Sequence, residues 1–253
     1  PENHPLVRPD TMEAEAVHRL LVIAREADAP VMVVHLTNKK AFEEVMHARA
    51  NGQKVYAETC PQYLLLDDSV YTKPDFQGAV YVCAPPIRKK EDQDCLWEAL
   101  SREDIQTVAT DQCSFTLAQK ALGKDDFTKI PGGLPGVQTR GTLLYTYGVK
   151  EGRITQEQMC KLLSENPAKL YGVYPQKGVL APGSDADIVV LDPEKESVIS
   201  AATHAYNTDN NPFEGIRLRC GIDKVFLRGS LTVDDGRLVK EKLGKYIARD
   251  RKS

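Results

Sequence analysis

The first half of the chain alternates helix-like and strand-like patterns. Over residues 11–27 the apolar positions recur at spacings of three and four, which predicts an amphipathic helix with Thr11 at its N-cap. The run 30–36, PVMVVHL, is almost continuously apolar and rich in valine, as expected for a parallel strand buried on both faces. A second helix is predicted over 38–50, and the Asn-Gly pair after it supplies a stop.

Further strand-like runs follow at 54–60, 79–86 and 105–111, and the last two flank a predicted helix near 91–102. Strands that alternate with helices at this spacing predict right-handed parallel β/α units. The pattern is compatible with a barrel and with an open sheet.

Beyond residue 111 the pattern changes. Residues 117–136 form a long, polar, glycine-rich connection, which is typical of a functional loop. The remaining predicted elements are helices near 137–147, 155–164 and 166–172 and strands within 177–193 and near 197–200, 223–228 and 231–233, with turn residues at 234–236. We therefore expect a small β module after the β/α part.

Composition narrows the class of protein. The 253 residues are 42% hydrophobic and 27% charged, which is enough to bury a sizeable core. The net charge of -3, with both signs intermixed, argues against a nucleic-acid partner or a membrane surface. No apolar run approaches the roughly 20 residues that cross a bilayer. The six cysteines are scattered without a C-x-x-C pair, which favours reduced thiols in the cytoplasm.

Two side chains with metal-binding chemistry stand where predicted strands end, His35 and Asp111. Functional groups in parallel β/α folds gather at the carboxyl ends of strands. A neutral imidazole binds zinc well, and a carboxylate can bind a metal and also accept a proton. Each residue also has an ordinary explanation, as a core histidine bonded to the backbone or as an Asx turn at a strand exit. Spacing alone leaves both explanations open.

Several segments together resemble one family. They include VVHLTNKKA at 33–41, TVATDQCSF at 107–115, DFTKIPGG at 126–133 and NPAKLYGVYPQKGVLAPGSDADIVVLDP at 166–193. The chain resembles the hydantoinase and dihydropyrimidinase branch of the amidohydrolase superfamily from Leu6 onward, and bacterial D-phenylhydantoinases most. The resemblance implies the C-terminal portion of a (β/α)₈ TIM-type barrel over residues 1–176. It also implies β-sandwich strands and a C-terminal tail over 177–253.

The resemblance further implies a reaction. Hydantoinases open the cyclic amide bond of hydantoins and dihydropyrimidines, giving N-carbamoyl amino acids, and therefore act on C–N bonds other than peptide bonds. They use two divalent metal ions, expected to be zinc, which a carboxylated lysine bridges. By this resemblance His35 ligates the more exposed metal. Asp111 ligates the more buried one and acts as general base and acid.

Main-chain groups hold the substrate ring in this family. The matching positions are Ala84, where serine is usual, and Gly132, where asparagine is usual. Spacing alone also allows ordinary loop punctuation at these places. The histidines His4 and His204 lie in polar segments and are predicted to be surface residues, and Cys113 is expected to play no part in metal binding.

Other ligands of the family's metal pair have no match in this sequence. There is no H-x-H pair and no counterpart of the bridging lysine in the 253 residues. We therefore expect the chain to be the C-terminal half of a longer enzyme and to be inactive alone. The resemblance implies a homotetramer at full length.

Two alternatives stay open. A non-catalytic scaffold of the collapsin-response-mediator kind would keep the fold and lose the ligands, although both His35 and Asp111 are present. An allantoinase or dihydroorotase would hydrolyse a related ring, but the segment at 126–133 resembles the hydantoinase branch more closely.

Overall fold

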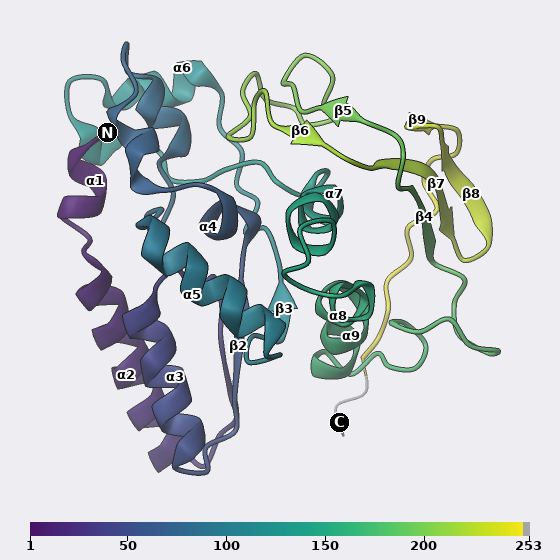
Figure 1. Ribbon diagram of the computed structural model, residues 1–253, viewed down its shortest axis with the longest axis horizontal. Helices are drawn as coiled ribbons and strands as arrows, with labels where there is room; N and C mark the ends of the chain where they lie inside the picture. The colour runs from purple at the N-terminus through teal and green to yellow at the C-terminus, as the bar shows by residue number, and fades with distance from the viewer. Residues whose placement is uncertain (250–253) are drawn as a thin grey trace. The chain divides into compact units, whose positions relative to one another are not determined.

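The computed structural model of the protein describes residues 1–249 (Figure 1). The chain forms two compact units. The first unit comprises Pro1–Arg140 and Ile199–Gly215, and the second comprises Gly141–Val198 and Ile216–Ser253. The division at residues 176 and 177 that the family resemblance implies differs from these bounds and stays a prediction.

A three-stranded parallel sheet with the order β1-β2-β3 organises the first unit. Its strands are β1 (Val31–Val33), β2 (Val55–Thr59) and β3 (Thr107–Val108). Val33 pairs with Ala57 and Thr59 pairs with Val108, so all three carboxyl ends lie at one edge of the sheet. The runs at 30–36, 54–60 and 105–111 were therefore read correctly as parallel strands. Burial of the run 30–36 on both faces was wrong, because Val34 is 43% exposed. The sheet is open in the described part of the chain.

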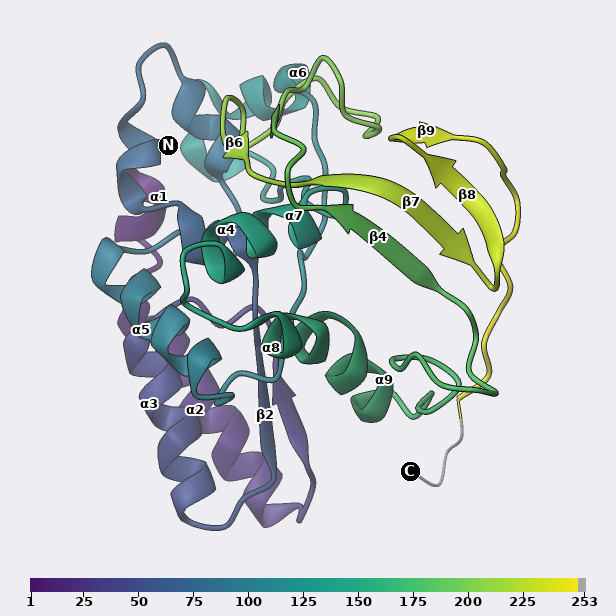
Figure 2. The ribbon, with the colours of Figure 1, turned by 45° about the vertical axis from the view of Figure 1, so that its right-hand side comes forward.

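Three long helices belong to the same unit, and Figures 1 and 2 show them beside the sheet: α2 (Asp10–Glu26), α3 (Lys39–Ala50) and α5 (Lys90–Ser101). Asn38 caps α3 through a hydrogen bond from the Ala41 N–H, and Gly52 follows its end at φ 83°. The predicted cap at Thr11 is wrong. Pro9, with an extended backbone, holds the N-cap position of α2, which places Thr11 inside the helix.

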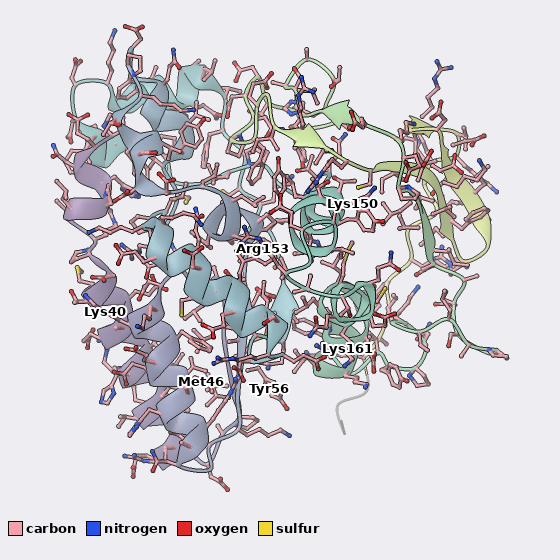
Figure 3. The ribbon with its side chains drawn as sticks, in the orientation of Figure 1. Lys40, Met46, Tyr56, Lys150, Arg153 and Lys161 are labelled. Carbon is pink, nitrogen blue, oxygen red and sulfur yellow. The ribbon has the colours of Figure 1, made fainter. Side chains whose placement is uncertain are left out.

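Side chains of α3 and α5 pack on the sheet because the apolar positions share one face of each helix. Figure 3 labels Met46 of α3 and Tyr56 of β2 in this layer. The fully buried positions, each 0% exposed, include Val45, Ala57, Leu96, Leu100 and Ile105. This core fixes where the strands end.

The predicted strand at 79–86 is absent. Residues Gln77–Tyr81 form the 3₁₀ turn η2, and an irregular segment follows. Its residues Val82 and Cys83 are nonetheless buried. A short buried loop has the same apolar signature as a strand, which explains the error. The first unit also contains α1 (Asn3–Leu6), α4 (Pro61–Leu65), η1 (Asp68–Thr72), α6 (Leu117–Lys120), η3 (Ala121–Gly123) and η4 (Phe127–Lys129).

The second unit joins short helices to antiparallel strands. Its helical segments are α7 (Arg140–Leu144, which begins at the unit boundary), η5 (Tyr145–Val149), α8 (Gln156–Cys160), η6 (Lys161–Glu165) and α9 (Asn166–Leu170), and Figure 3 labels Lys150, Arg153 and Lys161 there. One antiparallel sheet has the order β4-β7-β8-β9, made by β4 (Ile188–Asp192), β7 (Gly221–Leu227), β8 (Ser230–Asp234) and β9 (Arg237–Leu238). A second sheet pairs β5 (Ser197–Val198) with β6 (Arg217–Leu218).

The turn between β8 and β9 confirms the hairpin expected at 234–236. Asp235 and Gly236 both have positive φ, 48° and 76°, as a two-residue hairpin turn that matches the strand twist requires. Among the residues described, no helix is long and apolar enough to cross a membrane.

Candidate functional site

His35 and Asp111 lie at the same edge of the parallel sheet. The sheet's hydrogen bonding continues to both: the Leu36 N–H donates to Glu58 O at 2.7 Å, and the Ala109 N–H donates to Thr59 O at 3.0 Å. The Thr59 hydroxyl at the end of β2 also donates to Leu36 O at 2.8 Å, which links β2 to the residue after His35. The structure therefore brings the two predicted side chains to one carboxyl edge, with the end of β2 between them.

Both residues leave their strands in a left-handed backbone conformation, with φ 41° at His35 and φ 51° at Asp111. This region is uncommon for residues other than glycine, and histidine and aspartate enter it more readily than most. Backbone strain of this kind concentrates at functional sites. Hydrophobic periodicity does not predict these backbone angles.

The carboxylate of Asp111 affects two buried thiols. Burial is the main cause that raises the pKa of Cys60 well above its usual range, and the charges of Glu58 and Asp111 raise it further. Burial likewise raises the pKa of Cys83 to about 12, with a smaller contribution from Asp111. Both thiols are thus protonated at neutral pH.

The donor atoms at this edge suit a divalent metal only in part. An imidazole nitrogen and a carboxylate oxygen are common ligands of zinc. Within residues 1–249, however, no three His, Cys, Asp or Glu side chains gather closely enough to hold an ion. His35 is half-buried and Asp111 is exposed. They fit as two ligands of a metal centre that other groups would complete.

Ala84 and Gly132, the predicted ring-binding positions, lie side by side. A methyl group placed on Gly132 would stand 3.8 Å from Ala84 N. The Gly133 N–H donates to Val82 O at 2.9 Å, which ties the two segments together. We call residues 82–84 and 131–134 the platform.

The platform is continuous with the end of β3. Leu134 pairs with Gln112, the residue after Asp111, and its carbonyl accepts from the Cys113 N–H at 3.0 Å. Asp111 therefore immediately precedes, in the chain, the residue that pairs with the platform. Cys113 itself is an exposed, free thiol.

The main-chain groups of Ala84 and Gly132 are free for a ligand. Both residues are exposed. Within the described chain, neither N–H donates a hydrogen bond and neither carbonyl accepts one. Since nearly all buried backbone groups are paired, free groups at the surface of such a tightly bonded loop are available to bind.

Two buried residues that support the platform were not predicted from the sequence. The Lys120 ammonium, with 2% of the residue exposed, donates to Val82 O at 2.8 Å, Pro131 O at 2.8 Å and Gly133 O at 3.0 Å. Burial lowers the pKa of Lys120 to about 8. A lysine in a polar segment carries no sequence signal for such burial.

His4 is the second. The prediction of a surface residue is wrong, because His4 is only 4% exposed and donates from Nε2 to Cys83 O at 2.8 Å. Its Nδ1 lies 3.2 Å from the Arg8 guanidinium, so the neutral tautomer with the proton on Nε2 satisfies both contacts. Burial and nearby cations lower the pKa of His4. His204 is half-buried and donates to Thr208 O at 2.9 Å.

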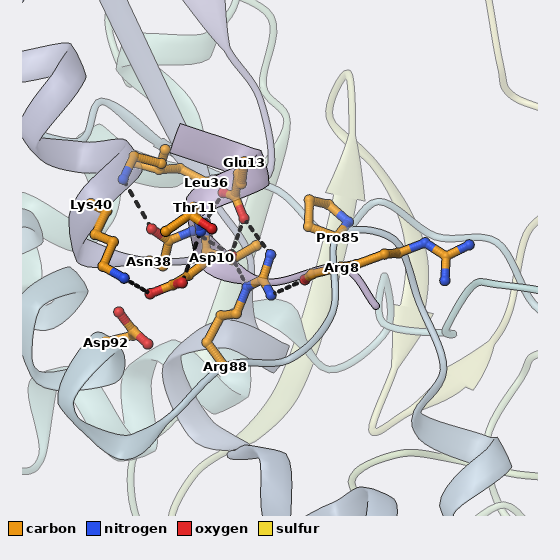
Figure 4. Close-up of polar contacts among 12 residues, drawn as sticks. Arg8, Asp10, Thr11, Glu13, Leu36, Asn38, Lys40, Pro85, Arg88 and Asp92 are labelled. Atoms are coloured by element: carbon orange, nitrogen blue, oxygen red, sulfur yellow. Dashed lines mark hydrogen bonds and ion pairs between the residues drawn. The ribbon is translucent and has the colours of Figure 1, made fainter. Parts of the chain in front are cut away.

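A buried ion pair joins the turn after His35 to the segment after the platform (Figure 4). Arg88 Nη2 lies 3.1 Å from Glu13 Oε2, and the two side chains are 7% and 9% exposed. Arg88 Nε donates to the Thr37 hydroxyl at 3.0 Å, and the Thr37 N–H donates to Glu13 Oε1 at 2.9 Å. Thr37 follows His35 by two residues, so this network fixes the metal-ligand candidate relative to the platform.

Sequence comparison decides the family. The sequence pattern of the amidohydrolase family matches residues 8–232. The chain belongs to the amidohydrolase family. Within this family it is a member of the hydantoinase and dihydropyrimidinase group.

The relatives support this assignment at considerable identity. The chain is 45% identical to a D-hydantoinase of Geobacillus stearothermophilus over 251 residues, which cover 98% of this chain and 53% of the relative. It is 42% identical to a D-phenylhydantoinase of Escherichia coli over 252 residues, covering 98% of this chain and 54% of the relative. The chain therefore spans about half the length of the relatives it matches.

Solved structures agree. A dihydropyrimidinase from Brevibacillus agri superposes with a TM-score of 0.93 at 45% identity, covering 94% of this chain and 52% of that one. A D-hydantoinase (dihydropyrimidinase) from Thermus sp. gives 0.94 at 41% identity, covering 96% and 53%. An L-hydantoinase from Arthrobacter aurescens gives 0.83 at 32% identity, covering 92% and 51%.

Proposed function

We propose that a protein containing this chain hydrolyses the cyclic amide bond of hydantoins or dihydropyrimidines and releases N-carbamoyl amino acids. The observation that carries the proposal is the placement of Asp111 and His35 at one strand edge, with the residue after Asp111 paired to Leu134 of the platform that exposes the main-chain groups of Ala84 and Gly132. Chemistry and ring binding thus adjoin in one unit.

The proposal includes a fold. We assign β1, β2 and β3 to the last three strands of a (β/α)₈ barrel, and the antiparallel strands to part of a β-sandwich. The superposition on half of several hydantoinase structures supports this assignment. In such a barrel, residues at the carboxyl ends of strands line the active site.

In the proposed reaction Asp111 moves the proton. Its carboxylate accepts a proton from the attacking water and returns it to the ring nitrogen as the amide bond breaks. One group can serve both steps because it is exposed at the strand end, where it can face the nucleophile and the leaving atom in turn. Two divalent ions, expected to be zinc, would supply Lewis-acid activation of the water and the ring carbonyl, held here by His35 and Asp111.

Ring binding falls to the platform. Hydantoin and dihydropyrimidine rings carry alternating carbonyl and N–H groups along one edge. The free N–H and C=O groups of Ala84 and Gly132 complement such an edge. Because the contacts come from main-chain atoms, alanine in place of serine and glycine in place of asparagine preserve them.

The test compares the complete protein with its Asp111→Asn and Asp125→Asn variants. Asparagine accepts the left-handed backbone at 111, so the fold is expected to persist. Asp125 is exposed on the loop before the platform and provides the matched control. Ring opening of hydantoin, 5-phenylhydantoin and dihydrouracil is followed by mass spectrometry of the N-carbamoyl product, after zinc or manganese is supplied.

We expect Asp111→Asn to lower kcat/KM by about 1,000-fold or more and Asp125→Asn to leave it unchanged. Wild-type protein that binds no metal and opens none of these rings would overturn the proposal and favour a non-catalytic scaffold. The 253-residue chain alone is expected to be inactive, because it offers two ligands. The homotetramer and the cytoplasmic location stay predictions.

A further inference from the structure

Lys120 is a buried cation that pairs with carbonyl groups and not with a carboxylate. Its ammonium donates three hydrogen bonds, one to each of Val82 O, Pro131 O and Gly133 O. No ion pair involves it anywhere in residues 1–249. Taking an ammonium out of water without a counter-ion is costly, so the three carbonyl dipoles must compensate its charge. All three of its protons are used.

The three carbonyls come from both halves of the platform. Val82 belongs to one segment, and Pro131 and Gly133 flank Gly132 in the other. The ammonium therefore crosslinks the segment that ends at Ala84 to the loop that carries Gly132. The only main-chain bond that the structure records directly between these segments is Gly133 N–H to Val82 O at 2.9 Å, within the described residues.

The position of Lys120 is itself fixed. It is the last residue of α6, whose start is held by a reciprocal capping pair of Thr116 and Gln119. The Leu117 N–H donates to Asp209 Oδ1 at 2.7 Å. The ring of Phe115 lies 5.6 Å from the ammonium and covers it.

The contact with Pro131 O has an electronic consequence. The carbonyl of Pro131 and the N–H of Gly132 belong to one peptide unit. A charge-assisted hydrogen bond to the carbonyl polarises that unit and makes its N–H a stronger donor. The Gly132 N–H donates to nothing within the described chain, so the strengthened donor remains available to a ligand.

We propose that Lys120 is a positioning residue for ring binding: it clamps the two halves of the platform together and strengthens the Gly132 N–H as a donor to the substrate's ring carbonyl. This inference rests on the proposed function for the identity of the ring. The clamp itself rests on geometry alone.

The test uses the complete protein with Lys120→Met, which keeps an apolar stem of similar length and removes all three donors. Lys124→Met is the matched control, because Lys124 is exposed on the same loop. Four quantities are measured: kcat and KM for ring opening, hydrogen exchange of the Gly133 amide, and the melting temperature.

We expect Lys120→Met to raise KM about tenfold or more while kcat changes less, and to accelerate exchange of the Gly133 amide, which bonds to Val82 O across the clamp, about tenfold. Lys124→Met should leave both unchanged. Unchanged KM and exchange in a folded Lys120→Met protein would overturn the proposal, as would an equal effect of Lys124→Met. If wild type opens no ring, the proposed function fails, and the exchange measurement still decides the clamp.

A second variant and an experiment on the unmodified protein cover the case in which Lys120→Met does not fold. Lys120→Gln retains two donor hydrogens and should show a smaller rise in exchange. Acetylation of native wild-type protein at neutral pH, read by mass spectrometry, should modify Lys124 and Lys129 and spare Lys120. Modification of Lys120 at the rate of Lys124 would overturn the clamp.

Discussion

The strand ends and the platform differ in what they expose. At the strand ends, His35 and Asp111 are half-buried and exposed side chains that leave their strands with positive φ. In the platform the ligand-facing groups belong to the main chain, and the side chains that matter, Lys120 and His4, are buried beneath it. The strand ends present side chains, whereas the platform presents main-chain groups that buried side chains fix in place.

The difference shows where each region tolerates change. A reactive side chain can be replaced without much cost to the fold, because few contacts depend on it. A main-chain surface tolerates many side chains at its exposed positions but depends strongly on the residues that hold it. We therefore expect the strand ends to be sensitive in activity and the platform to be sensitive in stability.

Substitution of Gly133 in the platform gives the largest expected effect on stability. Gly133 has φ 154°, and a methyl group on it would stand 2.3 Å from Cys113 O. Gly133→Ala should lower the free energy of unfolding by about 3 kcal/mol, from backbone strain and the forced shift of Cys113. Gly132→Ala is the control, because its nearest contacts lie at 3.8 Å, and its effect should stay within about 0.5 kcal/mol. Denaturant unfolding measures both, and equal effects would break the comparison.

Replacement of His35 tests the other side of the comparison. His35→Asn keeps a residue that accepts positive φ and removes the imidazole. We expect kcat/KM of the complete protein to fall by at least about 100-fold, with loss of bound metal, while the melting temperatures of metal-free wild type and metal-free variant stay nearly equal. His47, exposed on α3, supplies the control variant His47→Asn. Full activity and full metal content in His35→Asn would remove His35 from the proposed site.

The sequence predicted the strand ends because their signal is local. The runs at 30–36 and 105–111 carry His35 and Asp111 at or near their ends, and parallel pairing with the run at 54–60 brings those ends to one edge. Helix periodicity located α2, α3 and α5 for the same reason. The cap of α2 was misplaced by two residues, since a proline with extended backbone preceded the predicted threonine.

The support of the platform could not be predicted in this way. His4 bonds to a carbonyl 79 positions away, and Lys120 bonds to one 38 positions away. Both lie in polar segments, where exposure is the expected state for these residue types. The run at 79–86 was wrongly predicted as a strand, because burial of Val82 and Cys83 against such distant groups leaves the same pattern as burial in a sheet.

The smallest expected effect concerns acid and the histidine under the platform. Burial and the nearby cations Arg8, Lys120 and Arg88 lower the pKa of His4 in the folded protein, so the unfolded chain takes up the proton first. The stability that neutral His4 contributes is thus fully present above its ordinary pKa of 6.5 and is lost as the pH falls through its lowered folded value.

His4→Gln removes this titration and keeps an amide that can donate to Cys83 O. At pH 7.5 we expect it to cost below about 1 kcal/mol. Between pH 7.5 and 5 the melting temperature of the wild type should fall further than that of the variant. The other titratable groups are the same in both proteins, so the difference reports His4. Calorimetry at several pH values measures the difference. Identical pH profiles would contradict this prediction. They would mean that His4 becomes protonated in the folded protein without a loss of stability, despite its burial beside Cys83 O.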